Sequence, residues 1–157
     1  MPTLFKERYF EDYAVGDSAE FGAMPVDADE IVAFAERYDP QPFHVDPDAA
    51  ARSPFGGLIA SGWMTAGIMM RMLCDHFLSE RASLGSPGVE ELRWVRPVRP
   101  GDTLQMRATI EATRRSRSKP DRGLLWLRYE VTNQSGEVVM TCRAMALLRC
   151  RDGAPAT

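Results

Sequence analysis

Hydrophobic residues are spaced in two different ways along the 157-residue chain, and the change comes after Gly88. Between about residue 27 and residue 79, apolar runs follow residues that typically start helices. After Gly88, short segments rich in strand-forming residues are separated by turn residues. The pattern predicts helices in the first half of the chain and strands in the second, with one earlier edge segment and strand within residues 8–25.

Two helices are expected ahead of residue 53. Asp27, with a glutamate three positions later, fits an N-cap, so a helix should begin there and end near Tyr38. Asp46 followed by Pro47 fits a second N-cap with a first-turn proline, which predicts a short helix through residue 51.

A longer helix should run from Gly62 to about Ser79, with Ser61 as its N-cap. Its apolar residues point in nearly every direction around the axis, and such a helix is normally buried. At ~18 residues and ~1.5 Å per residue it is about 27 Å long, close to the width of about five strands at ~4.8 Å spacing. We therefore expect a sheet to wrap around this helix.

Four strand-like segments follow the long helix. Residues 99–102 and 133–136 are tight turns, and the longer connection at 114–123 is basic. Consecutive strands joined in this way should pair antiparallel. With the earlier strand they predict an α+β fold in which an antiparallel sheet of about five strands wraps around one central helix. The expected segments are Val89–Val98, Thr103–Thr113, Leu124–Thr132 and Val138–Leu148.

The stretch from Tyr38 to His44 carries the candidate chemistry. It contains Pro40 and Pro42, which cannot both lie inside a helix or a paired strand, so it should be a shaped loop. In a regular helix Asp39 and His44 would face about 140° apart. A loop that curls back lets both side chains converge on one small group, such as a water molecule.

Composition indicates a single soluble globular domain over residues 1–157, with an ordered core at about 8–150 and a tail at 151–157. A net charge of -3 gives no general attraction to nucleic acid or to an anionic membrane. The charged start of the chain does not fit a secretory signal, so we expect a cytoplasmic protein. Its three cysteines form no CxxC, which argues against a disulfide framework and a zinc site.

The chain resembles a single hot-dog domain of the MaoC-like family, which includes the (R)-specific enoyl-CoA hydratases. The most specific part is the segment Asp39-Pro40-Gln41-Pro42-Phe43-His44-Val45-Asp46, whose Asp-to-His spacing matches the hydratase motif. The resemblance implies that Asp39 and His44 are catalytic. It also implies that Gly62 and Ser61 form the oxyanion and substrate-binding position, where Gly62 offers a backbone N–H to the thioester oxygen. The implied reaction is hydration of a 2-enoyl-CoA to a 3-hydroxyacyl-CoA, or the reverse dehydration.

The implied reaction needs no cofactor beyond the coenzyme A or acyl-carrier portion of the substrate, and no metal.

Three positions depart from the family pattern: Gln41 stands for the usual Asn, Ser61 for a frequent His, and Met70 for a serine of some hydratases. Because of Gln41 and Met70, a non-catalytic acyl-CoA-binding protein is one alternative function. A second alternative is an acyl-CoA thioesterase, which the hot-dog architecture supports by analogy.

Two further expectations concern partners. Arg115, Arg117 and Lys119 in the basic connection could contact the phosphates of coenzyme A, although a solvated hairpin tip is the simpler interpretation. A sheet with open edges and one missing wall predicts a homodimer or a higher homo-oligomer. The second histidine, His76, lies near the expected end of the long helix and is more simply a surface contact.

Overall fold

The computed structural model describes residues 4–153 and contains four helices and five strands within them. Short 3-10 turns lie at Phe5–Glu7, Phe10–Asp12 and Arg151–Gly153. The expected tail beyond residue 153 lies outside the described residues. The helices are α1 (Ala28–Tyr38), α2 (Pro42–Val45), α3 (Pro47–Arg52) and α4 (Gly62–His76); the strands are β1 (Ser18–Pro25), β2 (Val89–Trp94), β3 (Thr103–Arg115), β4 (Arg122–Thr132) and β5 (Val138–Arg149).

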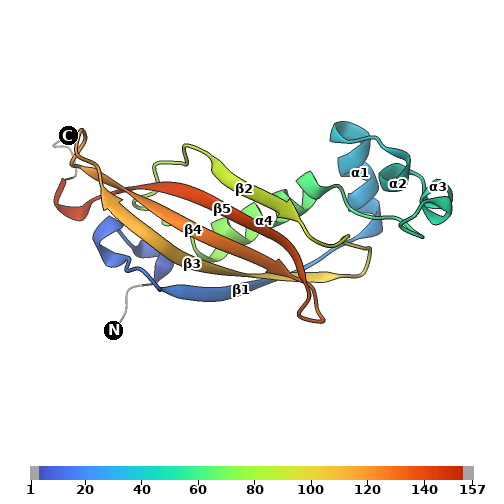
Figure 1. Cartoon of the computed structure of the whole chain (residues 1–157), viewed down its shortest axis with the longest axis horizontal. Helices are drawn as coiled ribbons and strands as arrows, with labels where there is room; N and C mark the ends of the chain where they lie inside the picture. The colour runs from blue at the N-terminus through green and yellow to red at the C-terminus, as the bar shows by residue number, and fades with distance from the viewer. Residues whose placement is uncertain (1–3, 154–157) are drawn as a thin grey trace.

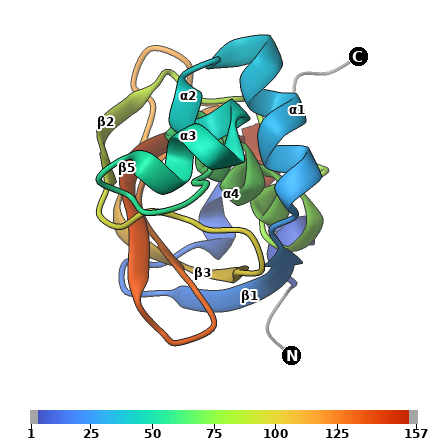
Figure 2. The same cartoon turned by 90° about the vertical axis from the view of Figure 1, so that its right-hand side faces the viewer.

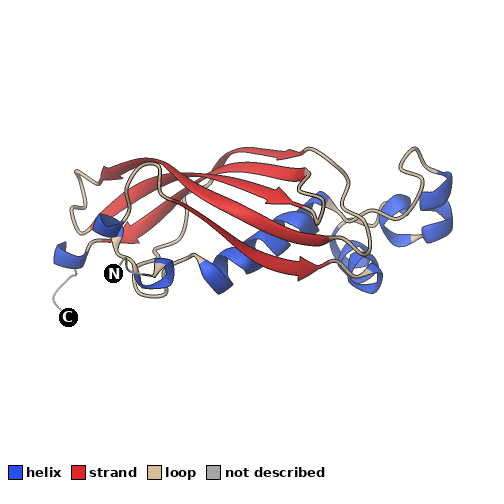
Figure 3. Ribbon diagram, turned by 90° about the horizontal axis from the view of Figure 1, so that it is seen from below, coloured by secondary structure: helices blue, strands red, loops and turns tan. Residues whose placement is uncertain are grey.

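The five strands form one antiparallel sheet in the order β1-β3-β4-β5-β2. The sheet curls around α4, which lies against one of its faces, while α1, α2 and α3 gather at one end (Figures 1 and 3). Viewed from that end, the three short helices stand in front of α4 (Figure 2). This is the predicted α+β hot-dog fold. Within residues 4–153, no helix is long and apolar enough to cross a membrane.

The core lies between α4 and the concave face of the sheet. Met72, Leu73 and Phe77 at the end of α4 are at most 2% exposed, as are Leu104 and Ile110 on β3. Buried residues alternate with partly or fully exposed ones along β3 and β4, as expected for strands with one buried face. This packing fixes the position of α4 and therefore of its N-terminus, where the candidate site lies.

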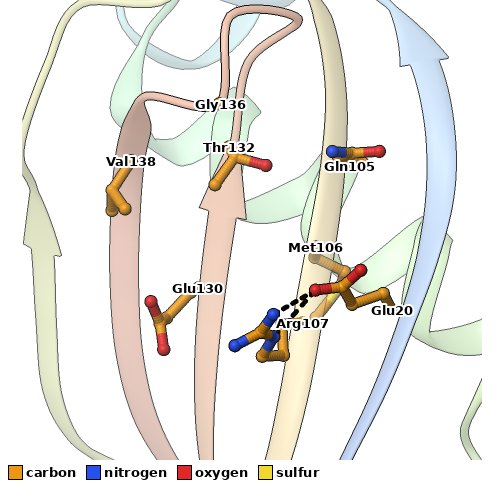
Figure 4. A pocket seen from close by; sticks show the side chains of 8 residues that line it. All are labelled: Glu20, Gln105, Met106, Arg107, Glu130, Thr132, Gly136 and Val138. Atoms are coloured by element: carbon orange, nitrogen blue, oxygen red, sulfur yellow. Dashed lines mark hydrogen bonds and ion pairs between the residues drawn. The ribbon is translucent and has the colours of Figure 1, made fainter.

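The outer face of the sheet carries charged residues that pair across strands. Arg107 is in register with Glu20 on β1 and with Glu130 on β4, and its guanidinium donates to the Glu20 carboxylate. These side chains line a shallow depression of about 300 Å³ together with Gln105 and Thr132 (Figure 4). Opposite charges in neighbouring positions stabilise an antiparallel sheet modestly, so this face can remain in contact with water.

The prediction that consecutive strands pair was wrong for β2. This strand pairs with β5 and lies at the sheet edge, and it ends at Trp94 rather than Val98. Pro97 has no N–H to donate to a ladder, and the Val98 carbonyl instead accepts from the N–H of Ala60, ahead of α4. The segment after β2 therefore crosses toward the candidate site instead of forming a hairpin with β3.

The long helix is also shorter and less enclosed than predicted. It ends at His76, three residues before Ser79, because Phe77 leaves the helical conformation as its C-cap. Trp63 and Met70 are 61% and 48% exposed, so one stripe of α4 faces solvent in the single chain. The sheet and α1 pack against other faces of this helix.

Candidate active site

The site begins where α1 ends. Asp27 caps α1 by accepting from the N–H of Glu30, as predicted, and Asp39 is the C-cap, with its N–H donating to Ala35. The segment that follows is not a loop throughout, which corrects the prediction. Pro42 is the first residue of α2, where its missing N–H costs nothing, and this short helix carries His44.

His44 is 4% exposed, and both of its ring nitrogens are engaged. Its Nδ1 lies 2.7 Å from the carbonyl oxygen of Ile59. A carbonyl can only accept, so Nδ1 carries a hydrogen and donates it. The other nitrogen, Nε2, lies 3.3 Å from Oδ2 of Asp39. The ring nitrogen that faces the carboxylate is therefore Nε2, while Nδ1 is held by the backbone.

Asp39 accepts hydrogen bonds on both carboxylate oxygens. Gln41 Nε2 donates to Oδ1 and Ser61 Oγ donates to Oδ2, each at 2.7 Å. The Gln41 hydrogen bond is the largest influence and lowers the pKa of Asp39. Burial opposes it, and the smaller contributions of the Ser61 hydrogen bond and of His44 lower the pKa further. Asp39 is thus an ionised acceptor at neutral pH. The predicted convergence of Asp39 and His44 is present in the structure.

Gly62, the first residue of α4, lies under the indole ring of Trp94. Trp94 Nε1 donates to the Gly62 carbonyl oxygen at 2.8 Å. A Cβ at position 62 would lie 2.3 Å from the nearest indole carbon, so only glycine allows this packing. The first N–H groups of a helix have no acceptor within the helix, and the helix dipole favours negative charge at that end.

A cavity of about 290 Å³ joins the imidazole of His44 to Gly62. Phe43, Phe55 and Val98 supply apolar walls, and Trp94 and Arg96 lie at the β2 side. Sequence reasoning missed Trp94 and the buried Thr65, which also lines the cavity. Trp94 is 32 positions from Gly62 in the sequence, and no local spacing connects the two.

A family model described as a MaoC like domain matches residues 12–124 of the chain. The chain belongs to the MaoC-like family. The matched range includes Asp39, His44 and the whole of α4. The resemblance based on the Asp39–Asp46 segment is thereby confirmed at the level of the family.

Individual MaoC-like proteins are similar over most of this chain. The crystal structure of the MaoC-like dehydratase from Rhodospirillum rubrum has 44% sequence identity and a TM-score of 0.85, and the match covers 92% of this chain and 98% of that one. The (R)-specific enoyl-CoA hydratase of R. rubrum is 29% identical over 91% of this chain and 93% of its own length. Mesaconyl-CoA hydratase from Cereibacter sphaeroides is 30% identical over 94% of this chain, which spans 43% of that relative.

Other predicted site residues lie away from the pair. Met70, which stands for a serine of some hydratases, lines a separate apolar cavity with Val89 and Tyr129. The end of β3, which carries Arg115, and its connection to β4, which carries Arg117 and Lys119, lie at the end of the sheet opposite α1–α3 (Figure 1). Arg115 Nε donates to the carbonyl of Pro120 within that connection. One copy of this MaoC-like chain therefore does not bring these cations to His44.

Two further observations bear on ligands. Across residues 4–153, no three His, Cys, Asp or Glu side chains are grouped so that they could hold a metal ion. His76 packs against Phe21 with the two rings tilted, at a ring-centroid distance of 5.7 Å, far along α4 from Gly62. In this MaoC-like domain the cavity is lined by the titratable side chains of His44 and Arg96, and Asp39 pairs with His44 at its margin.

Proposed function

We propose that the protein catalyses the reversible addition of water to the double bond of an enoyl thioester, converting a 2-enoyl-CoA to a 3-hydroxyacyl-CoA. The observation that carries the proposal is the pairing of His44 Nε2 with the Asp39 carboxylate beside an apolar cavity. Membership in the MaoC-like family and similarity to an (R)-specific enoyl-CoA hydratase support this reaction class.

Hydration of an enoyl thioester makes three chemical demands. A base must take a proton from water, an acid must protonate the α-carbon, and the negative charge that develops on the thioester oxygen must be stabilised. General acid–base assistance by a positioned group typically contributes ~10²–10⁴-fold to the rate. The Asp39–His44 pair, acting on one water molecule, supplies the first two functions.

The N-terminus of α4 supplies the third. The N–H of Gly62 and the helix dipole favour a partly negative oxygen at this position, and removal of such a donor in other enzymes costs about 3–4 kcal/mol. The cavity beside Gly62 is walled by Phe43, Phe55 and Val98, which suits an acyl chain. Coenzyme A or an acyl carrier enters as part of the substrate, and the proposed chemistry calls for no other cofactor.

The experiment follows the loss of ultraviolet absorbance of conjugated enoyl-CoA substrates of several chain lengths. Asp39→Asn and His44→Ala should each abolish this loss while the protein stays folded. Asp46→Asn, at the cap of α3, and His76→Ala are matched controls that should keep the activity. Full activity in both site variants would refute the site assignment. Tight acyl-CoA binding without turnover would favour a binding protein, and release of free thiol a thioesterase.

A second copy of the chain is the partner that we propose for the free edge of β2. β2 ends the sheet on one side, and Trp94 and Val95 on that edge are 45% and 53% exposed. Both residues also line the cavity beside His44. A partner on this edge would therefore cover apolar surface and complete one wall of the substrate cavity.

Backbone polarity supports pairing of two β2 strands. The N–H of Val95 donates to Val139, next to β2 on the neighbouring strand β5. Because N–H groups alternate in direction along an antiparallel strand, those of Leu92 and Trp94 point to the free edge. Two copies related by a two-fold axis can then exchange hydrogen bonds along this edge and extend the sheet.

Charge favours one register for that pairing. Leu92 packs toward the core, so Glu91 and Arg93 point to the outer face of the sheet. A two-fold axis through Leu92 places Glu91 of each copy opposite Arg93 of the other. An axis through Glu91 or through Arg93 instead places like charges opposite one another, which is unfavourable. We therefore propose a homodimer with the axis at Leu92.

The proposed contacts between Arg115, Arg117 or Lys119 and the phosphates of coenzyme A depend on the same assembly. These residues lie at the opposite end of the sheet from His44 in one chain (Figure 1). Antiparallel pairing of β2 strands turns the second copy end for end, so its basic connection lies toward the site end of the first. The phosphate contacts are therefore proposed across two copies, not within one.

A further inference from the structure

Ser61 occupies a position between the catalytic carboxylate and the N-terminus of α4. Its side chain is fully buried, and its Oγ takes part in two hydrogen bonds. It donates to Asp39 Oδ2 at 2.7 Å and accepts from the N–H of Trp63 at 3.3 Å. A hydroxyl has one hydrogen, and that hydrogen is directed to Asp39 because an amide N–H can only donate.

This arrangement differs from the role that the family resemblance implied for Ser61. The cavity is lined by the residues on either side, Ala60 and Gly62, while Ser61 itself points to Asp39. A bound thioester would therefore meet the backbone of Gly62, and the Ser61 hydroxyl is already committed to the carboxylate. The serine acts on the reaction through Asp39.

We infer that Ser61 is a positioning residue that holds Asp39 as a fixed, ionised acceptor and leaves His44 Nε2 as the atom that carries the proton during hydration. The inference rests on the proposed hydratase function. Gln41 contributes from the other side by donating to Oδ1. With both oxygens engaged by donors, Asp39 orients the water and stabilises the imidazolium at 3.3 Å.

The division of roles gives a balanced reaction. Asp39 accepts one hydrogen of the water, which stays on the oxygen and becomes the hydroxyl hydrogen of the product. The other O–H bond breaks and its proton goes to the Nε2 lone pair of His44, while the oxygen forms a bond to the β-carbon and the π electrons of the double bond shift to the α-carbon and the thioester oxygen. The imidazolium then gives the proton to the α-carbon, so His44 returns to its neutral form and Asp39 keeps its charge.

The charged surroundings of Asp39 agree with this division. The ionisable side chain that faces it is His44, from α2, and the hydrogen bonds of Gln41 and Ser61 act in the same direction as His44 by lowering the pKa of Asp39. Removal of the Ser61 hydroxyl takes away one of these influences. The pKa of Asp39 should then move up toward its ordinary value.

A carboxyl ¹³C NMR titration of Asp39 tests this directly, with the resonance assigned by its loss in Asp39→Asn. Ser61→Ala should raise the midpoint, and Ser61→Thr, which keeps the hydroxyl, should leave it near that of the unmodified protein. The control is Ser79→Ala, because Ser79 is 3% exposed and also caps backbone N–H groups, but it lies beyond the other end of α4. An unchanged Asp39 midpoint in Ser61→Ala would overturn the inference.

Kinetics provides the second measurement. Ser61→Ala should lower kcat for enoyl-CoA hydration by about ten- to a hundredfold, the range that corresponds to a hydrogen bond to a charged group, with little change in KM. Ser61→Thr should restore most of the rate, and Ser79→Ala should keep it. An unmodified protein that hydrates no enoyl thioester would refute the proposed function, whereas the titration would still decide whether Ser61 positions Asp39.

Discussion

Reversing single charges on the free edge of β2 should control whether two copies of the chain associate. Glu91→Arg places two arginines on the outer side of this strand, and Arg93→Glu places two glutamates there. With the two-fold axis at Leu92, either variant alone sets like charges opposite one another. In an equimolar mixture, Arg at position 91 of one variant faces Glu at position 93 of the other, and Arg at position 93 faces Glu at position 91. Mixed dimers should therefore form.

The size of the effect follows from the number of contacts. Opposite charges directly across an antiparallel pair contribute roughly 0.2–1 kcal/mol, and like charges are unfavourable by a similar amount. The two-fold axis makes each contact occur twice, so replacing two attractions by two repulsions weakens association by about 1–4 kcal/mol. The dissociation constant should therefore rise roughly five-fold to several hundredfold. High salt should reduce the difference because these side chains lie at the surface.

Sedimentation velocity at micromolar concentrations measures the association. Glu91 and Arg93 also pair within one chain, at 2.8 Å, so a matched pair with the same spacing is needed as a control. Arg128 and Glu130 provide it, because they pair at 3.3 Å on the outer face of β4, away from the free edge. Reversal of either control charge should leave the dimer intact. Dimers of equal stability in both single β2 variants, or a mixture that stays monomeric, would refute the register.

Two further predictions concern the site. Gly62→Ala should lower the free energy of unfolding by about 1–3 kcal/mol in urea denaturation, because its Cβ would lie within 2.3–2.6 Å of the Trp94 ring, and adding Trp94→Leu should recover most of the loss. A single variant as stable as the unmodified protein would contradict this packing. The pKa of Asp39 is lowered from its ordinary value of 3.8 in the folded chain, so its charge stabilises the fold above that pH, and the stabilisation is lost as the pH falls through the lowered pKa. Asp39→Asn should therefore flatten the dependence of unfolding free energy on pH in that acidic window, and an unchanged slope would argue against it.

Local signals were sufficient to predict most of the elements. The cap at Asp27, the cap at Ser61 and the alternation along β3 and β4 each depend on residues a few positions apart, and each is present in the structure. The partner of β2 was not predictable in this way. Its choice depends on Pro97 and on the contact of the Val98 carbonyl with the segment before α4, which is distant in sequence.

The same difference between local and long-range signals applies to the candidate site. The spacing of Asp39 and His44 lies within one short segment, so the sequence identified the pair. The groups that hold the pair come from elsewhere: Ser61 is 22 positions from Asp39, and Trp94 is 32 positions from Gly62. Such contacts depend on how α4 and β2 are placed by the sheet. Sequence alone therefore indicated the candidate pair better than its surroundings.

The backbone around Ile59 ties the two halves of the site together. Its N–H donates to the carbonyl of Phe43 at 3.2 Å, and its own carbonyl accepts from His44 Nδ1 at 2.7 Å. These reciprocal bonds fasten α2 to the segment that leads into α4, so the imidazole is held in place before any substrate arrives. Little ordering entropy then remains to be lost when a ligand binds, and most of the favourable contact energy is available for binding the acyl group and for the reaction.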